Sequence, residues 1–100
     1  MILETAEIPV TPGHEADFEA AVRQAVPLFL GSRGCRGVRL HRVTETPGLY
    51  RLVVDWETLE DHTVHFRGSE AFGQWRDLVA SHFAAPPNVT HSEQVLSSAG

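Results

Sequence analysis

The segment 52–83 constrains the fold more than any other stretch of the chain. It joins an apolar run, Leu52–Trp56, to two short helical patterns separated by Gly68 and Ser69. Val53 makes the run apolar on both of its faces, which is typical of a central strand. Both tryptophans, three of the five phenylalanines and three of the six histidines lie in this segment. We therefore expect it to line any pocket that the protein has.

Residue spacing outside this segment predicts one long helix and three more strands. Apolar residues recur at helical intervals from Phe18 to Phe29, so we expect an amphipathic helix. Thr11 is the expected cap of this helix, with Pro12 at its first position. Alternation with a period of two predicts the further strands, which cover residues 2–10, 38–41 and 89–95.

The order strand, helix, strand, strand, helices, strand predicts an α+β fold of the ferredoxin-like βαββαβ type, with helices on one face of an antiparallel sheet. The other face would be covered most simply by a second copy, so we expect a homodimer through the sheet faces. Thr58 with Asp61, and Ser69, are the expected caps of the two short helices. A single domain should span residues 1–96, followed by a flexible tail at 97–100.

Composition narrows the classes of partner. Thirteen acidic residues against eight basic ones give a net charge of −5, which disfavours nucleic acid and an anionic membrane surface. The single cysteine, Cys35, excludes an internal disulfide and a Cys-rich metal site. The N-terminus does not read as a secretory signal, and no segment approaches the ~20 apolar residues of a membrane span. We therefore expect a cytoplasmic protein.

Five short features resemble one known family. They are Pro12-Gly13 followed by Phe18, Gly34-Cys35-Arg36-Gly37, Trp56-Glu57, His65-Phe66, and Ser69-Glu70-Ala71-Phe72. In this order and spacing, over residues 2–96, the chain resembles the antibiotic biosynthesis monooxygenase (ABM) family of dimeric α+β barrels. The resemblance implies that fold and a homodimer. The activities that it implies are mixed: cofactor-independent oxygenation of anthrones and quinols, haem degradation, and isomerisation of a signalling molecule.

Haem degradation is the activity that the residues support least. The resemblance implies that haem-degrading members of the family use three residues: an Asn on strand one, a Trp in the short helix and a His in the last helix. The corresponding positions hold Ala6 and Glu7, His65, and a residue close to Trp75. The set is not reproduced, so we do not expect haem to be a substrate.

His65 is the predicted catalytic base. A cofactor-independent oxygenase must remove a proton from an electron-rich phenol or enol, and imidazole titrates near neutral pH. The alternative is that His65 bonds a backbone carbonyl and holds the helix junction. His62 lies one helical turn earlier, so both imidazoles could face one side. A metal held by both, with Glu57 or His41, is the weaker reading; a solvated or dimer-contacting His62 is favoured.

The residues expected to bind substrate are aromatic or imidazole side chains. An indole N–H could grip a substrate oxygen, although core packing is the alternative for both tryptophans. The set is Trp56, His62, Phe72, Trp75, Phe29 and Tyr50. We expect no metal and no cofactor. The chain has no Gly-rich phosphate loop or dinucleotide fingerprint, so nucleotide cofactors are unsupported, and it has no nucleophile elbow, so serine hydrolysis is unsupported.

These observations favour a cofactor-independent monooxygenase acting on a small aromatic, quinol-like molecule of the polyketide type. The alternatives are a non-catalytic small-molecule-binding or stress-associated homodimer, and an isomerase on the same scaffold. A cavity of about 300 Å³ or more that reaches His65 would support a ligand site. A core filled by Phe72, Trp75 and Phe29 would support the non-catalytic alternative.

Overall fold

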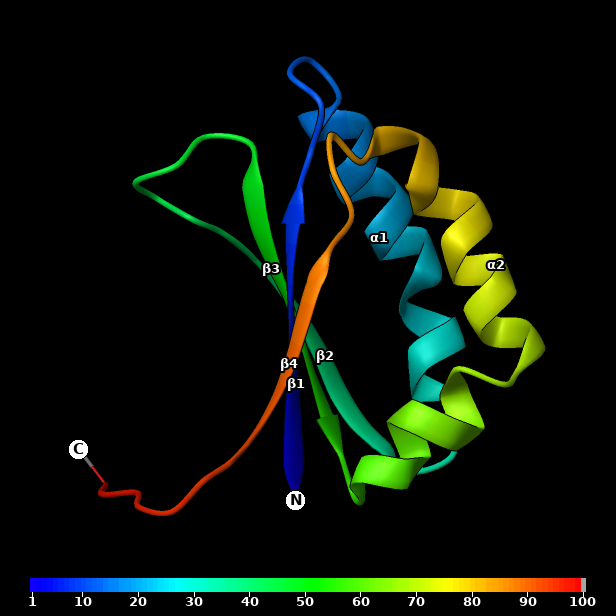
Figure 1. Ribbon diagram of the computed structural model, residues 1–100, viewed down its shortest axis with the longest axis vertical. Coiled ribbons are helices and arrows are strands. Elements are labelled where there is room, and N and C mark those ends of the chain that lie inside the picture. The colour runs from blue at the N-terminus through cyan, green and yellow to red at the C-terminus, as the bar shows by residue number, and fades with distance from the viewer. Residues whose placement is uncertain (100) are drawn as a thin grey trace.

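The computed structural model describes residues 1–99, and its elements follow one another along the chain as Figure 1 shows. They are β1 (Ile2–Pro9), α1 (Glu15–Leu30), β2 (Cys35–Arg42), β3 (Leu49–Trp56), the π-helix η1 (Asp61–Phe66), α2 (Glu70–Val79), the short 3₁₀ helix η2 (Ala80–His82) and β4 (Asn88–Glu93). Gly100, the end of the predicted tail, lies outside the described residues. No helix within residues 1–99 is long and apolar enough to cross a bilayer.

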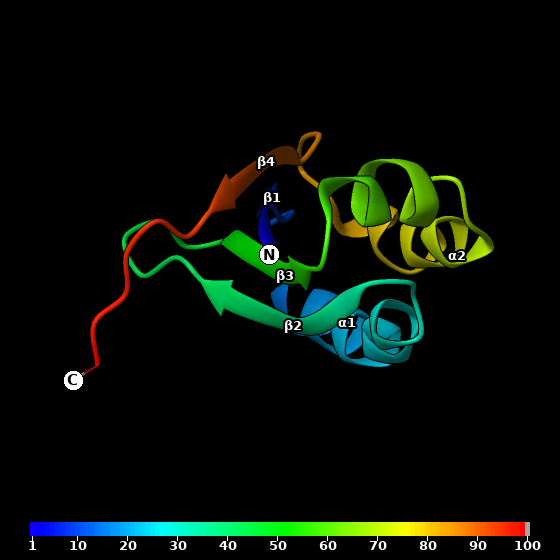
Figure 2. The same cartoon turned by 90° about the horizontal axis from the view of Figure 1, so that it is seen from below.

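The four strands form one antiparallel sheet in the order β2-β3-β1-β4. β1 lies inside the sheet, between β3 and β4, and Glu4 pairs with Val54 on one side and His91 on the other. Both long helices lie on the same side of the sheet (Figures 1 and 2). The predicted βαββαβ architecture with helices on one face is therefore confirmed.

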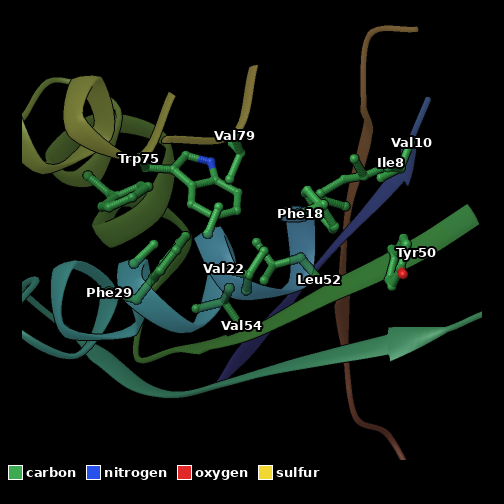
Figure 3. Packing of buried hydrophobic residues seen from close by; sticks show 14 of the residues in the cluster. Ile8, Val10, Phe18, Val22, Phe29, Tyr50, Leu52, Val54, Trp75 and Val79 are labelled. Atoms are coloured by element: carbon green, nitrogen blue, oxygen red, sulfur yellow. The ribbon is translucent and has the colours of Figure 1, made fainter. Parts of the chain in front are cut away.

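The core fills the space between the sheet and the two long helices (Figure 3). Phe18 and Phe29 of α1 are at most 1% exposed, and Trp75 of α2 packs edge-on against Phe29 with ring centroids 4.9 Å apart. Leu52 and Val54 supply the sheet side of the same cluster. Burial of each such side chain contributes roughly 1.5–3 kcal/mol.

The predicted start of the long helix is wrong. Thr11 is not the N-cap residue; His14 occupies that position without a side-chain hydrogen bond to the helix, and α1 begins at Glu15. Gly13 adopts φ = 91°, a left-handed conformation that an α-helix cannot contain, so residues 11–13 form a turn. The carbonyl of Thr11 accepts a 2.9 Å bond from the His14 amide within this turn.

The caps predicted for the two short helices are confirmed. The Thr58 amide donates to Asp61 Oδ2 and the Asp61 amide donates to Thr58 Oγ1, both at 3.2 Å, which is the reciprocal arrangement of a capping box. Ser69 Oγ accepts from the amide of Phe72 at the start of α2. The last strand is shorter than predicted, because β4 ends at Glu93.

Candidate functional site

The π-helix η1 turns His62 toward the sheet and leaves the side chain of His65 exposed to solvent. The amide of Arg67 donates to the carbonyl of His62, an i→i+5 bond that makes this turn wider than an α-helical one. Residues three apart therefore no longer lie one above the other. His62 is 2% exposed, whereas His65 is exposed. The expectation that both imidazoles face one side is wrong.

His62 belongs to a buried polar cluster that joins η1 to three strands. Trp56 Nε1 donates to Glu4 Oε1 at 2.9 Å, and His62 Nε2 lies 3.3 Å from the same oxygen. His62 Nδ1 is 2.7 Å from Nε2 of His91, the residue of β4 that pairs with Glu4. The Trp56 and His62 rings stack with centroids 5.5 Å apart. The sheet register thus holds the whole cluster in place.

Burial acts on the two titratable groups at the centre of this cluster in opposite directions. Desolvation raises the pKa of the Glu4 carboxyl above 4.5, and the Trp56 hydrogen bond and the charge of Arg67 offset this only partly. Desolvation lowers the pKa of His62 to about 4, aided by Arg67 and His91. His62 is therefore neutral near pH 7. A carboxyl whose pKa is shifted toward neutral pH is well suited to proton transfer.

A cavity of about 260 Å³ lies between the sheet and α2, and Glu4 borders it. Oε1 of Glu4 is taken by Trp56, so Oε2 is the oxygen left without a hydrogen-bond partner in residues 1–99. No fully buried side-chain oxygen or nitrogen of those residues lacks a partner, so Oε2 is not fully buried. Because Glu4 lines the cavity, Oε2 is the carboxyl oxygen available to an occupant.

The rest of the cavity wall is largely aromatic and aliphatic. Ala6, Ile8, Leu52 and Val89 form the sheet side; the aromatic members are Phe29, Phe66, Phe72, Trp75 and Phe83. A dry cavity of about 150 Å³ can hold benzene, so this one has room for more than a single ring. Its volume is below the 300 Å³ expected of a ligand site, and His65 is not among its lining residues.

The predicted binding residues fall into two groups. His62, Phe29, Phe72 and Trp75 line the cavity, and Trp56 lies behind it as the donor to Glu4. Tyr50 lies outside the cavity, as does the predicted base His65.

Tyr50 lies toward the other end of the sheet, where its hydroxyl donates to Glu19 Oε2 at 2.5 Å. It borders a wider cleft of about 500 Å³ beside α1 and β2, where Arg42 makes a two-bond pair with the same carboxylate. The Arg42 and Tyr50 bonds hold the pKa of Glu19 at about 2, so this group stays ionised. A permanently paired carboxylate is less suited to proton transfer than Glu4. The binding role of Tyr50 and the basic role of His65 stay predictions.

Two members of the cluster were missed by the spacing argument. Glu4 has the same phase as Ala6 and Ile8 on β1, and His91 has the same phase as Val89 on β4. An ionisable residue on the buried face of a strand is rare unless it is paired or functional. That interruption of the apolar pattern is the signal that could have identified both.

The metal alternative gains no support from the described residues. Among residues 1–99 no group of three or more His, Cys, Asp and Glu side chains is placed to hold an ion. His41 lies on β2 opposite Arg51, on the sheet face away from His62, and Glu57 pairs with Arg36.

Comparisons with known proteins agree with this architecture. A sequence model of the family described as "Antibiotic biosynthesis monooxygenase" matches residues 1–78, a range that contains every cluster member except His91. A protein of Bacillus subtilis (strain 168), "Uncharacterized protein YczJ", is 39% identical over 95 residues, which is 95% of this chain and 100% of that protein.

Solved structures extend the match to the last strand. A Bordetella bronchiseptica protein that bears the family's name is 58% identical, with a TM-score of 0.93 over 95% of this chain and 97% of that one. SnoaB of Streptomyces nogalater, a cofactor-independent oxygenase whose crystal structure is that of a point mutant, has a TM-score of 0.81 at 12% identity, over 96% of this chain and 94% of that one. At that identity SnoaB shares the fold and nothing further is inferred from the likeness.

Proposed function

The chain belongs to the antibiotic biosynthesis monooxygenase family, and on that basis we propose that it is a cofactor-independent monooxygenase of a small aromatic, quinol-like compound. One observation carries the proposal: a buried carboxyl, Glu4, with one oxygen free of hydrogen bonds, lines a cavity whose wall is largely aromatic and aliphatic. Such a cavity has one group able to accept a proton and several surfaces able to hold a flat ring.

Glu4 begins the reaction by removing a proton from the substrate. The resulting anion is electron-rich and gives one electron to O₂, and the two radicals combine to a peroxide anion at the reacting carbon. Glu4 returns its proton to this anion, which becomes a hydroperoxide. The O–O bond then breaks, and the second hydrogen of the reacting carbon leaves as a proton with the departing hydroxide, so that CH₂ + O₂ becomes C=O + H₂O. The aromatic walls exclude bulk water, which would otherwise stabilise the anion and slow its oxidation.

Trp56 and His62 are positioning residues in this scheme. The indole N–H fixes Oε1, and the neutral imidazole lies beside the same oxygen, so Oε2 stays directed toward the substrate. His91 ties His62 to β4 and links the buried cluster to the half-exposed edge of the sheet. The base predicted from the sequence, His65, is retained as a rival to be tested beside Glu4.

An isomerase is the second candidate, because Glu4 alone suffices for proton transfer and needs no O₂. The modest cavity volume favours the remaining alternative, a homodimer that binds a small molecule without catalysis. The three candidate functions differ in what is consumed. A monooxygenase consumes substrate and O₂, an isomerase consumes substrate alone, and a non-catalytic binding protein consumes neither.

The test is oxygen uptake by chelator-treated protein with a panel of anthrones and quinols. The monooxygenase proposal predicts protein-dependent uptake that persists in chelator, with one oxygen atom of ¹⁸O₂ in the product. Substrate loss without uptake would establish the isomerase instead. Binding without either change would leave only the non-catalytic reading.

The same proposal includes a homodimer through the open sheet face, as expected for a sheet with helices on one side only. Leu3 and Thr5 of β1 and Val53 of β3 lie at the centre of this face, flanked by the Arg39–Asp55 ion pair. This mixture of apolar and paired polar groups is compatible with a protein interface.

A further inference from the structure

The arginines of this chain are distributed unevenly between paired and unpaired positions. All eight basic residues are arginines. Five of them contact a carboxylate within 4 Å; these are Arg33, Arg36, Arg39, Arg42 and Arg51. The other three have no such partner in residues 1–99. Arg23 of α1 borders the wider cleft beside β2, whereas Arg67 and Arg76 both line the cavity beside Glu4. Arg67 follows η1 and Arg76 lies in α2, so two separate elements bring them to one place.

The two guanidinium groups of the cavity wall face a single carboxyl. Glu4 is the one carboxyl among the residues that line the cavity, and its burial disfavours the ionised form. His62, the other titratable group of the wall, is neutral near pH 7. The cavity thus carries positive charge in a chain whose net charge is −5. Arginine is the side chain that best matches a carboxylate, because its planar guanidinium can donate two parallel bonds.

We propose that the cavity takes an aromatic compound that carries a carboxylate, with the carboxylate on Arg67 and Arg76 and the ring between Phe72 and Trp75. This inference rests on the proposed function and names its substrate class. Both guanidinium-bearing side chains are exposed, whereas Glu4 is buried, so the anionic group lies at the mouth and the ring points inward. The reacting carbon is then held at the buried end, beside Glu4.

The test compares one ligand pair that differs only in charge, 1-hydroxy-2-naphthoate and 1-hydroxy-2-naphthamide, by calorimetry in the absence of oxygen. We expect the acid to bind wild-type protein about tenfold or more tightly than the amide, consistent with about 1.4 kcal/mol or more for charge-assisted bonds. Arg67→Gln and Arg76→Gln should each reduce the ratio of the affinity for the acid to the affinity for the amide. The double variant should bring this ratio close to one. Rising salt should weaken binding of the acid more than of the amide.

Arg36→Gln is the matched control, because Arg36 is paired with Glu57 away from the cavity, and it should keep the wild-type ratio. Glu4→Gln should lower turnover without reducing this ratio, because it removes an acidic group and no cationic one, so loss of catalysis and loss of charge selection are separable. Equal affinity for acid and amide would overturn the inference. So would a preference for the acid that persists in the double variant, or failure of both compounds to bind at millimolar concentration.

Discussion

Glu4 and His62 lie in contact, and each is driven by burial toward its neutral form. Their contact is therefore not an ion pair near pH 7, although the two groups could form one if they were solvated. A neutral imidazole next to a carboxyl leaves that carboxyl free to gain and lose a proton during a reaction. This division of roles is the reason for assigning proton transfer to Glu4 and positioning to His62.

The His62 pKa makes a prediction about stability. An unfolded imidazole binds its proton near pH 6.5, whereas folded His62 does so only near pH 4, so acidification between these values favours unfolding. Between pH 7 and pH 5 the wild type should lose about 2 kcal/mol more unfolding free energy than His62→Gln. Urea denaturation at both pH values measures this difference.

Glu4 acts in the other direction, because a raised carboxyl pKa lowers stability as pH rises above 4.5. The comparison must therefore be made between variants and not on the wild type alone. His65→Gln is the control and should follow the wild type. Parallel pH dependence in wild type and His62→Gln would show that His62 is not buried as a neutral group.

At the scale of elements, η1 decides which histidine reaches the cavity. The chain has His at 62 and 65, and an α-helix would have left both on related faces. The i→i+5 bond from Arg67 to His62 separates them. We expect diethyl pyrocarbonate to modify His65 more than about tenfold faster than His62, because reaction at a buried ring requires local opening.

Single-histidine peptides make this measurement unambiguous. Trypsin cuts after Arg51 and Arg67, so peptide 52–67 carries only His62 in His65→Gln and only His65 in His62→Gln. Mass spectrometry of that peptide from each variant gives the two rates, and urea-unfolded protein gives the reference. Equal rates in the folded variants would contradict the π-helical arrangement.

The elements themselves were largely predictable from the sequence, since their apolar periodicities are regular. Ser69 and the Thr58–Asp61 pair also act as predicted, because capping depends on residues three apart. The residues of the candidate site were harder to predict from the sequence. His65 was selected from local spacing, whereas the cluster depends on which residues of β1, β3 and β4 pair in the sheet. Such register is a long-range property, and a π-turn has no simple sequence signature.

At the scale of the whole molecule, the open sheet face is the place where the proposed second copy docks. Val53→Asp would place an unpaired charge at the centre of that interface, which costs several kcal/mol when such a charge is buried. We expect light scattering to show a dimer for wild type and a monomer for this variant. Val64→Asp is the control, because Val64 is 59% exposed on η1 and should leave the dimer intact. A Val53→Asp dimer would place the interface elsewhere.

The central claim is that Glu4 at the end of the aromatic cavity removes the substrate proton, and its most direct test is the rate of oxygen uptake in three proteins. With an active quinol or anthrone, Glu4→Gln should lower kcat by about 10²–10⁴, the usual contribution of a general base. His65→Ala should stay within about twofold of wild type, because its side chain lies outside the cavity wall. Wild-type rates in Glu4→Gln, together with loss of uptake in His65→Ala, would contradict the account.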